Sequence, residues 1–243
     1  MMFAIEAQDL TRNYHGLCAV DHISFKVEPG EVFGFLGPNG AGKSTTIKML
    51  TGQLRPTEGT AKVAGWDVVA ERDQMKPEIG VVFEYQNVYE RLSGRDNLSF
   101  YARIYGLAAG RVEEVLRLTG LLEQAGDKVK KYSNGMRQRL VIARGLLHQP
   151  RILFLDEPTR GLDPGVARDI RAIIADLSTD GVTVFLTTHY MEEADRLCHR
   201  VAIIHEGRCV ALGTPAELKA AYVAQDHATL EDVFLKLTGR ELA

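Results

Sequence analysis

Nine consecutive residues decide the fold of this chain: Gly37-Pro38-Asn39-Gly40-Ala41-Gly42-Lys43-Ser44-Thr45. The first eight fit the pattern G-x-x-x-x-G-K-S, in which glycines let backbone N–H groups converge on phosphate oxygens. An apolar run from Val32 to Leu36 precedes the stretch, and a helical pattern from Ser44 to about Thr51 follows it. This order of buried strand, glycine-rich loop and helix predicts a phosphate-binding loop rather than a simple connecting turn.

Two strand ends are predicted to supply the reactive groups. Lys43 is expected to reach the β- and γ-phosphates of ATP, and the Ser44 hydroxyl to bind Mg²⁺. The apolar run Ile152 to Leu155 delivers Asp156 and Glu157 to the carboxyl end of a parallel strand, where ligands bind in open α/β sheets. Asp156 can hold Mg²⁺ through its water shell, and Glu157 can polarise or deprotonate the attacking water. Two solvated acids would look the same in isolation, but the phosphate loop favours a shared site for ATP and Mg²⁺.

The composition of the whole chain limits its class. Its 243 residues are 45% hydrophobic and 25% charged, which is ordinary for a globular domain with a substantial core. The net charge of −3 and the dispersed basic residues argue against nucleic-acid binding. Three cysteines fit neither a metal site nor a paired disulfide framework, so reduced thiols are expected. The start lacks a signal-peptide pattern and no apolar stretch could span a bilayer, so another chain would supply any spanning helices.

The predicted fold class is α/β: a phosphate-loop NTPase core with a parallel sheet, an N-terminal antiparallel β subdomain and an inserted helical lobe. Alternating apolar residues up to Val27 predict antiparallel strands, and buried runs separated by helical stretches favour parallel crossovers. The break at Glu206-Gly207 predicts an edge hairpin, and Thr214 and Thr229 are expected to cap two closing helices. We predict one domain over residues 1–243, with core segments 1–86 and 140–213, a helical lobe 87–139 and C-terminal helices 214–243.

The segment Tyr132-Ser133-Asn134-Gly135-Met136 discriminates among phosphate-loop proteins. Ser133 can cap the helix that leads to the Asp156 strand, and Gly135 exposes its amide, so the helix start forms a second anion site. Here the sequence resembles, over essentially its whole length, the ATP-binding subunits of ABC transporters. In that family this element, usually Leu-Ser-Gly-Gly-Gln, contacts the γ-phosphate held by the partner subunit. The variant form and the tail from Thr229 to Gly239 resemble the export-type, drug-resistance-like branch (ABC-2).

The resemblance implies roles for further residues. Tyr14 corresponds to the aromatic residue that stacks on adenine, although an exposed tyrosine at a strand end would look the same. Asp163 belongs to the loop that crosses the dimer interface, and His189 matches the histidine that touches the γ-phosphate. The family places a glutamine that senses Mg²⁺ where this chain has Glu84, while Gln86 lies out of register. We hypothesise that Glu84 takes the role of that glutamine.

The resemblance further implies ATP hydrolysis coupled to transmembrane transport by a head-to-tail dimer. Hydrolysis needs one group of residues for catalysis, one for Mg²⁺ and one for contact with the nucleotide. The expected catalytic residues are Lys43, Glu157 and His189. The expected metal ligands are Ser44, Glu84 and Asp156. The expected nucleotide contacts are Tyr14, Gly37, Pro38, Asn39, Gly40, Ala41, Gly42, Lys43, Ser44, Thr45 and Asp163, with Ser133 and Gly135 from the opposite subunit.

The expected partners are a second copy or a close relative, and an integral membrane permease that exports drugs, lipids, polysaccharides or ions. No nucleic acid is expected. The protein is expected at the cytoplasmic side of the cell membrane as a peripheral subunit, and in the cytoplasm when unassembled. The stretch from Tyr85 to Leu92 is either a docking surface for the permease or a solvated loop with packing tyrosines.

Two other functions stay open. One is a soluble ABC ATPase with no transport role. The other is a phosphate-loop kinase or GTPase, which would leave Ser133, Gly135 and His189 idle and shows no motif for guanine.

Overall fold

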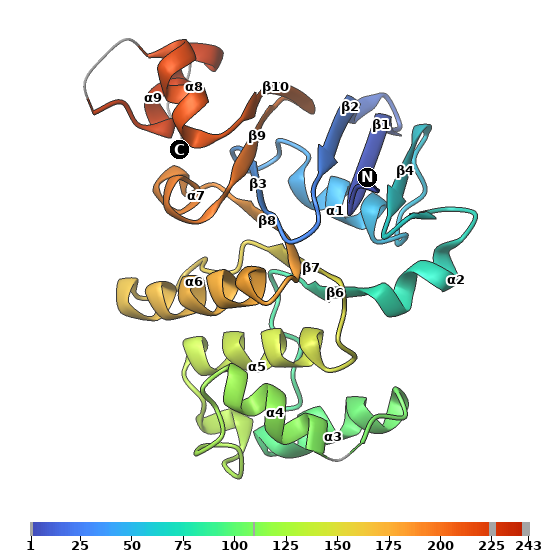
Figure 1. The fold of residues 1–243 in the computed structure, drawn as a ribbon, viewed down its shortest axis with the longest axis vertical. Helices are drawn as coiled ribbons and strands as arrows, with labels where there is room; N and C mark the ends of the chain where they lie inside the picture. The colour runs from blue at the N-terminus through green and yellow to red at the C-terminus, as the bar shows by residue number, and fades with distance from the viewer. Residues whose placement is uncertain (1, 109, 224–226, 240–243) are drawn as a thin grey trace.

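Two sheets form the body of the protein in the computed structural model, which describes residues 2–108, 110–223 and 227–239 (Figure 1). The smaller sheet is antiparallel, with the strand order β2-β1-β4-β5. Its strands are β1 (Ile5–Tyr14), β2 (Leu17–Val27), β4 (Glu58–Val63) and β5 (Trp66–Asp67). The predicted N-terminal antiparallel subdomain is therefore confirmed. The last four residues of the predicted domain lie outside the described residues.

The larger sheet has six strands in the order β10-β9-β3-β8-β7-β6. They are β3 (Val32–Leu36), β6 (Ile79–Val82), β7 (Ile152–Asp156), β8 (Thr183–Thr188), β9 (Arg200–His205) and β10 (Arg208–Gly213). All neighbours pair in parallel except β10, which forms the predicted edge hairpin with β9. Every residue of β3, β7 and β8 is buried, as expected of strands covered on both faces. The carboxyl ends of β3, β7 and β8 therefore meet at one edge.

Helices cover the sheet and build a separate lobe. They are α1 (Lys43–Leu50), α2 (Arg72–Met75), α3 (Gly94–Ile104), α4 (Gly110–Leu118), α5 (Asn134–Leu146), α6 (Pro164–Thr179), α7 (Met191–Leu197), α8 (Pro215–Tyr222) and α9 (Leu230–Thr238). Short 3₁₀ turns lie at Lys76–Glu78 and Val129–Lys131. Figure 1 shows α3, α4 and α5 grouped at one end, with α6 between them and the sheet. The predicted boundary between residues 139 and 140 is wrong in detail, because it falls inside α5.

Capping residues end up where the sequence predicts them. The Thr214 and Thr229 hydroxyls accept hydrogen bonds from the third backbone N–H of α8 and α9, in complete capping boxes. Ser93 caps α3 by accepting from the Asp96 N–H at 3.0 Å. The Leu92-Ser93-Gly94 sequence is thus a helix cap and not a second nucleotide element.

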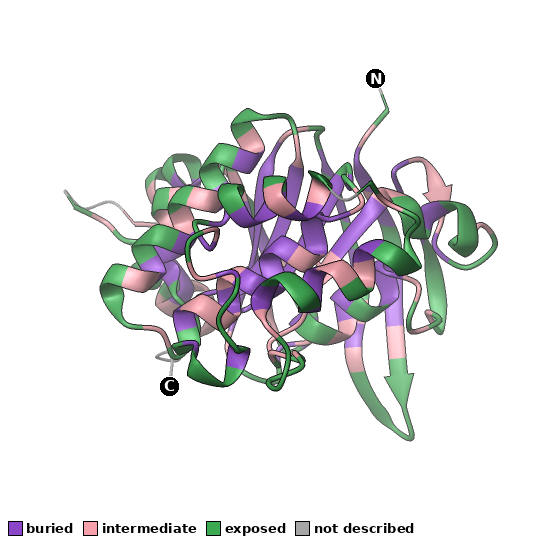
Figure 2. Ribbon diagram, turned by 90° about the horizontal axis from the view of Figure 1, so that it is seen from below, coloured by how far each residue is buried: buried purple, intermediate pink, exposed green. Residues whose placement is uncertain are grey.

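The apolar core lies on both faces of the six-stranded sheet, as the buried central ribbons in Figure 2 show. On one face, aromatic rings from both sheets pack together, with the centroids of Phe25 in β2 and Phe33 in β3 5.5 Å apart. On the other face, α5, α6, α7 and α9 contribute apolar residues to a second cluster. Full burial of one such side chain stabilises the fold by roughly 1.5–3 kcal/mol. The sheet is therefore a rigid support for the loops at its edge.

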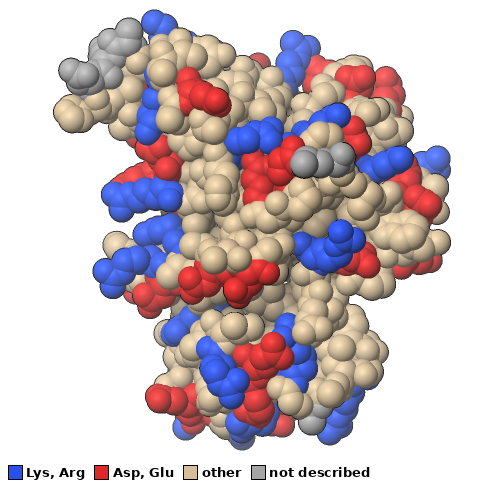
Figure 3. Space-filling model, viewed as in Figure 1, with Lys and Arg blue, Asp and Glu red and all other residues tan. Residues whose placement is uncertain are grey.

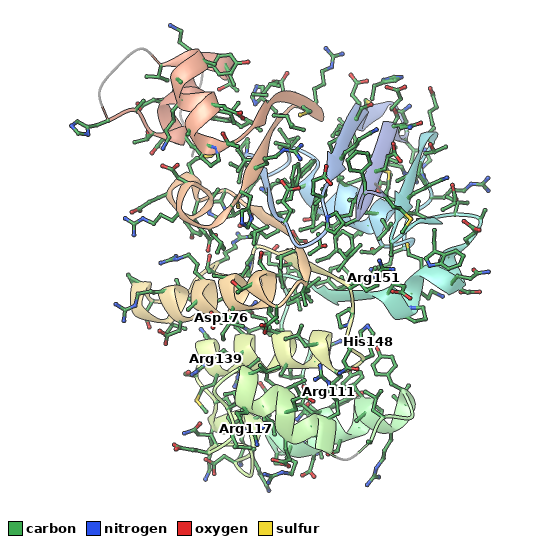
Figure 4. All side chains as sticks on the ribbon, in the orientation of Figure 1. Arg111, Arg117, Arg139, His148, Arg151 and Asp176 are labelled. Atoms are coloured by element: carbon green, nitrogen blue, oxygen red, sulfur yellow. The ribbon has the colours of Figure 1, made fainter. Side chains whose placement is uncertain are left out.

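The helical lobe is attached to the core through the end of α5. The Arg111 guanidinium donates from Nε to the Leu147 carbonyl at 2.9 Å, which joins α4 to α5. The imidazole Nε2 of His148 lies 2.8 Å from the Ile79 carbonyl, which joins the same region to β6 (Figure 4). These two contacts connect the helical lobe to the start of β6.

The surface carries both signs of charge. On the face shown in Figure 3, lysines and arginines are interspersed with aspartates and glutamates. The three cysteines are free thiols, with Cys18 exposed and Cys198 buried. Burial raises the pKa of Cys198, and raises that of Cys209 to about 11, so both stay protonated at neutral pH. Within the described parts of the chain, no helix has the length and apolar character required to cross a bilayer.

Candidate nucleotide-binding site

The phosphate loop connects the end of β3 to the start of α1. Gly40 and Gly42 have φ angles of 82° and 102°, in the left-handed region that favours glycine. A Cβ atom at Gly37 would lie 2.4 Å from the Ile204 carbonyl oxygen, and one at Gly42 would lie 2.5 Å from the Ala19 carbonyl oxygen. The glycines that the pattern requires are therefore required by close backbone packing as well.

A cavity of about 170 Å³ opens over this loop. It brings together most of the predicted phosphate-loop residues with acids from two other loops. Its lining consists of Ala19, Pro38, Asn39, Gly40, Gly42, Lys43, Ser44, Thr45, Glu84, Glu157 and Arg160. The other predicted site residues are not part of this lining: Tyr14, Gly37, Ala41, Ser133, Gly135, Asp156, Asp163 and His189.

Lys43 is a buried cation, with 6% of its side chain exposed. Its ammonium Nζ donates to the carbonyls of Gly37 at 2.7 Å and Pro38 at 3.2 Å. The same nitrogen lies 3.1 Å from Oε1 of Glu157. The ammonium group thus makes two hydrogen bonds to loop carbonyls and an ion pair with the carboxylate. The lysine is held in an extended position over the loop, where a phosphate oxygen could replace a carbonyl or the carboxylate.

Glu157 occupies a strained backbone conformation, with a φ of 53°. A non-glycine residue in this region costs of order 1–3 kcal/mol, and such strain concentrates at functional sites. Its N–H donates to both the carbonyl and the hydroxyl of Thr187, each at 3.1 Å, which fixes the turn after β7. Its Oε2 lies 2.8 Å from Nδ1 of His189. Glu157 and His189 meet because β7 and β8 are neighbours in the sheet.

The oxygens beside the phosphate loop suit Mg²⁺. The Asp156 side chain is buried, and its Oδ1 accepts a 2.6 Å hydrogen bond from the Thr187 hydroxyl. Ser44 is exposed in the first turn of α1. Carboxylate and hydroxyl oxygens are hard ligands of the kind that Mg²⁺ prefers. Among the described residues no group of three or more His, Cys, Asp or Glu could hold a metal by itself. Such a sparse set fits a Mg²⁺ ion that is bound together with substrate phosphates and water.

Glu84, and not Gln86, faces the phosphate cavity. Glu84 follows β6, and its Oε1 forms an ion pair with the Arg160 guanidinium. Gln86 points to α5 instead, where its Nε2 donates to the Asn134 carbonyl at 3.2 Å and to Oε1 of Gln138 at 3.0 Å. The expectation that Gln86 lies out of register agrees with these contacts.

The start of α5 has the predicted cap, and its residues Ser133 and Gly135 do not line the phosphate cavity. The Ser133 hydroxyl accepts from the Met136 N–H at 3.3 Å. A Cβ atom at Gly135 would lie 2.2 Å from Cγ1 of Val166, so this glycine also permits α5 to pack closely on α6. Asp163 is exposed at the start of α6, and its side chain makes no capping hydrogen bond.

Tyr14 ends β1 on the hairpin that also carries Ala19. Its ring is 37% exposed, and the Arg12 guanidinium carbon lies 4.6 Å from the ring centroid. One side of the ring thus makes a cation–π contact. The structure places Tyr14 outside the phosphate cavity but on the strand pair that borders it.

Two residues close to the predicted catalytic residues were not predicted as site residues. The first is Arg160, which could have been suspected only because it lies three residues after Glu157 in the sequence. Glu193 is 4% exposed, and burial raises its pKa above the ordinary value. The Arg171 guanidinium lies 3.9 Å from Glu193 and only partly offsets the effect of burial. Glu193 borders a cavity of about 550 Å³ next to His189, outside the phosphate cavity.

Known proteins resemble this chain in sequence. The family model described as ABC transporter matches residues 20–160. A fluoroquinolones export ATP-binding protein of Mycobacterium tuberculosis is 50% identical over 207 residues, which cover 84% of this chain and 67% of that protein. The daunorubicin/doxorubicin resistance ATP-binding protein of Streptomyces peucetius is 46% identical over 222 residues, which cover 90% of this chain and 67% of that protein.

Solved structures resemble it over nearly the whole chain. A structure described as the ATP binding subunit of an ABC transporter has a TM-score of 0.85 and 28% identity, covering 97% of this chain and 99% of that one. A dimeric ATP-binding cassette in a post-hydrolysis state, bound to ADP and Pi, has a TM-score of 0.77 and 25% identity, covering 86% and 98%. These matches confirm the predicted α/β fold class.

Proposed function

This chain belongs to the ATP-binding subunits of ABC transporters, and we propose that it powers export through a separate membrane permease. It binds ATP, and its ATPase activity is coupled to transport. This family membership excludes a kinase or GTPase. The observation that carries the site assignment is the connected set of Lys43, Glu157 and His189 at the phosphate loop.

Hydrolysis proceeds by in-line attack of a water oxygen on the γ-phosphorus, with rupture of its bond to the β–γ bridging oxygen. Lys43 leaves the Glu157 carboxylate for phosphate oxygens, and the loop amides hold the same anion. The freed carboxylate of Glu157 orients the water and accepts its proton. His189, already 2.8 Å from Glu157, keeps that carboxylate in position beside the γ-phosphate. ADP and phosphate leave.

Ser44, Asp156 and Glu84 are the residues that we propose to hold Mg²⁺ with ATP. Their hydroxyl and carboxylate oxygens match the ligand preference of the ion, which supplies charge neutralisation when bound. The Thr187 hydroxyl donates to Asp156 and so fixes the orientation of that carboxylate.

A head-to-tail homodimer completes the site in our proposal. The α5 N-terminus, with Ser133 as its cap, is an anion site that lies outside the lining of the phosphate cavity in its own chain. From a second copy it supplies Ser133 and Gly135 to the γ-phosphate, while Asp163 lies in the loop that crosses between the copies. The relation to a dimeric ATP-binding cassette supports this pairing. Tyr14 is proposed to offer its exposed ring to adenine at the border of the cavity.

Export is the transport direction that the relatives support, since both curated relatives described above are named for export of, or resistance to, drugs. The proposed location is the cytoplasmic side of the membrane, on the permease. Exposed aromatic residues of the segment between β6 and α3 are the proposed contact, with Tyr85 84% and Tyr89 48% exposed. Tyr89 packs edge-on against Phe100, which is 44% exposed, so the patch continues onto α3.

Purification from detergent-solubilised membranes of the source organism tests the transport role. We expect a polytopic membrane protein to co-purify with the tagged chain, and its recovery to fall several-fold in a Tyr85→Ala/Tyr89→Ala variant. The matched control is Tyr222→Ala in α8, far along the chain from this patch. Recovery of the chain without any membrane protein would instead favour a soluble ABC ATPase.

Glu84→Ala tests the proposed metal ligand. We expect the Mg²⁺ concentration for half-maximal hydrolysis to rise about tenfold, because the site loses one of three oxygen donors. The measurement is phosphate release at saturating ATP over a Mg²⁺ titration, with Glu90→Ala as an exposed control in the same loop. Unchanged Mg²⁺ dependence in Glu84→Ala would remove this residue from the metal site.

A further inference from the structure

Two cation–carboxylate pairs line the phosphate cavity. Lys43 lies 3.1 Å from Glu157, and Arg160 forms an ion pair with Glu84. All four side chains belong to the lining of the one cavity, so their formal charges cancel there. A nucleoside triphosphate carries several negative charges, and a neutral cavity attracts it weakly. Binding therefore requires that carboxylates release cations to the phosphates.

The first pair places a phosphate-loop cation against a carboxylate. The ion pair with Glu157 neutralises the Lys43 charge that would otherwise attract a phosphate oxygen. Arg160 likewise forms an ion pair with a carboxylate, that of Glu84, and both residues line the same cavity. The Arg160 side chain is 43% exposed. The five N–H donors of a guanidinium form a fixed fork that suits it to bind phosphate in a bidentate way.

The backbone keeps Arg160 beside the reactive end of the site. Its N–H donates to the Glu157 carbonyl at 3.2 Å, so the arginine is fixed to the turn that positions the catalytic carboxylate. Glu84 lies on a different segment, between β6 and the helical lobe. The pair thus connects two loops, and Arg160 is the member that remains near Glu157 if the pair opens.

We propose that Arg160 is a second phosphate-binding cation, which Glu84 holds in an ion pair until ATP binds. This inference rests on the proposed ATP site and adds a residue to it. The ATP γ-phosphate is the ligand of Arg160, because Arg160 and Glu157 share one turn and Glu157 faces the attacking water.

The test is a double-mutant cycle on nucleotide affinity without metal, in buffer with EDTA. Calorimetry measures the Kd of ATP and of ADP for the wild type, Glu84→Gln, Arg160→Gln and the double variant. Glu84→Gln is expected to bind ATP about tenfold more tightly, because a freed guanidinium gains charge-assisted hydrogen bonds to phosphate. ADP affinity should change about twofold at most, since ADP lacks the γ-phosphate. In the Arg160→Gln background, the gain for ATP should disappear.

Other outcomes overturn the inference. A tenfold gain that persists without Arg160 would show simple repulsion between Glu84 and ATP. An equal gain for ADP would place Arg160 away from the γ-phosphate. No gain in Glu84→Gln, with a lowered thermal unfolding midpoint, would assign the pair to loop packing alone. A wild-type chain that bound no ATP even when Mg²⁺ was present would overturn the proposed function itself, which separates the two failures.

Discussion

Replacing Glu157 with glutamine is expected to lower ATP hydrolysis by about 10²–10⁴-fold, the usual contribution of a positioned general base. Glutamine has nearly the same shape but cannot accept the proton of the attacking water. It also loses the charge that now attracts Lys43 at 3.1 Å. Lys43 is then free for phosphate, so ATP affinity should be unchanged or higher. Phosphate release and equilibrium nucleotide binding measure the two effects separately.

The same variant should form a stable dimer when ATP and Mg²⁺ are saturating. ATP contacts both subunits in the proposed arrangement, and slow hydrolysis leaves it in place. Glu192→Gln is the matched control, because Glu192 has a side chain that is 78% exposed and lies on α7, near the site. It should hydrolyse ATP at the wild-type rate. Ultracentrifugation that finds only monomers of Glu157→Gln under these conditions would contradict a site shared between two chains.

The parts of the site that depend on local geometry could be predicted from the sequence. The phosphate loop follows from glycine spacing between a buried strand and a helix, and close packing against Ile204 and Ala19 explains two of those glycines. Glu157 and His189 were each predicted to be catalytic, but a contact between them was not predicted. The structure provides it, because β7 and β8 are neighbours in the sheet and bring the two side chains to 2.8 Å.

Contacts between distant loops could not be predicted in this way. Glu84 and Arg160 are 76 positions apart, and neither follows a strand directly. Their pairing depends on how the helical lobe leaves β6 and how the chain turns after β7.

The sequence and the structure give different reasons why position 135 requires glycine. The resemblance assigns its amide to the partner's nucleotide, whereas the structure shows that a Cβ would overlap Val166. Both requirements can hold at one position, because the first turn of α5 packs on α6 while its N-terminus points outward. A substitution at Gly135 therefore cannot isolate the role in the dimer. Ser133 is the better probe, because it is exposed and contacts only its own helix cap.

Mixing two inactive variants tests whether the active site is composite. Lys43→Ala removes the phosphate-binding cation, and Ser133→Arg blocks the α5 N-terminus while Lys43 stays intact in that chain. Each variant alone should be inactive, because every site in its dimer lacks one required part. In a mixed dimer, the phosphate loop of the Ser133→Arg chain faces the intact Ser133 of the Lys43→Ala chain. Random pairing of equal amounts should restore about a quarter of the wild-type rate, since half of the dimers have one complete site of two.

Recovery of about a quarter of the wild-type rate would distinguish a site shared between two chains from a site contained in one chain. A site contained in one chain predicts no recovery at any ratio, because each chain keeps its own defect. Loss of folding through the missing cap is an insufficient explanation for inactivity, since such a cap contributes only about 1 kcal/mol. Ser93→Arg, which removes the equivalent cap of α3, measures that cost and should leave hydrolysis nearly unchanged. A titration with a maximum near equal amounts of the two variants would show that Lys43 and Ser133 act on one nucleotide from opposite subunits.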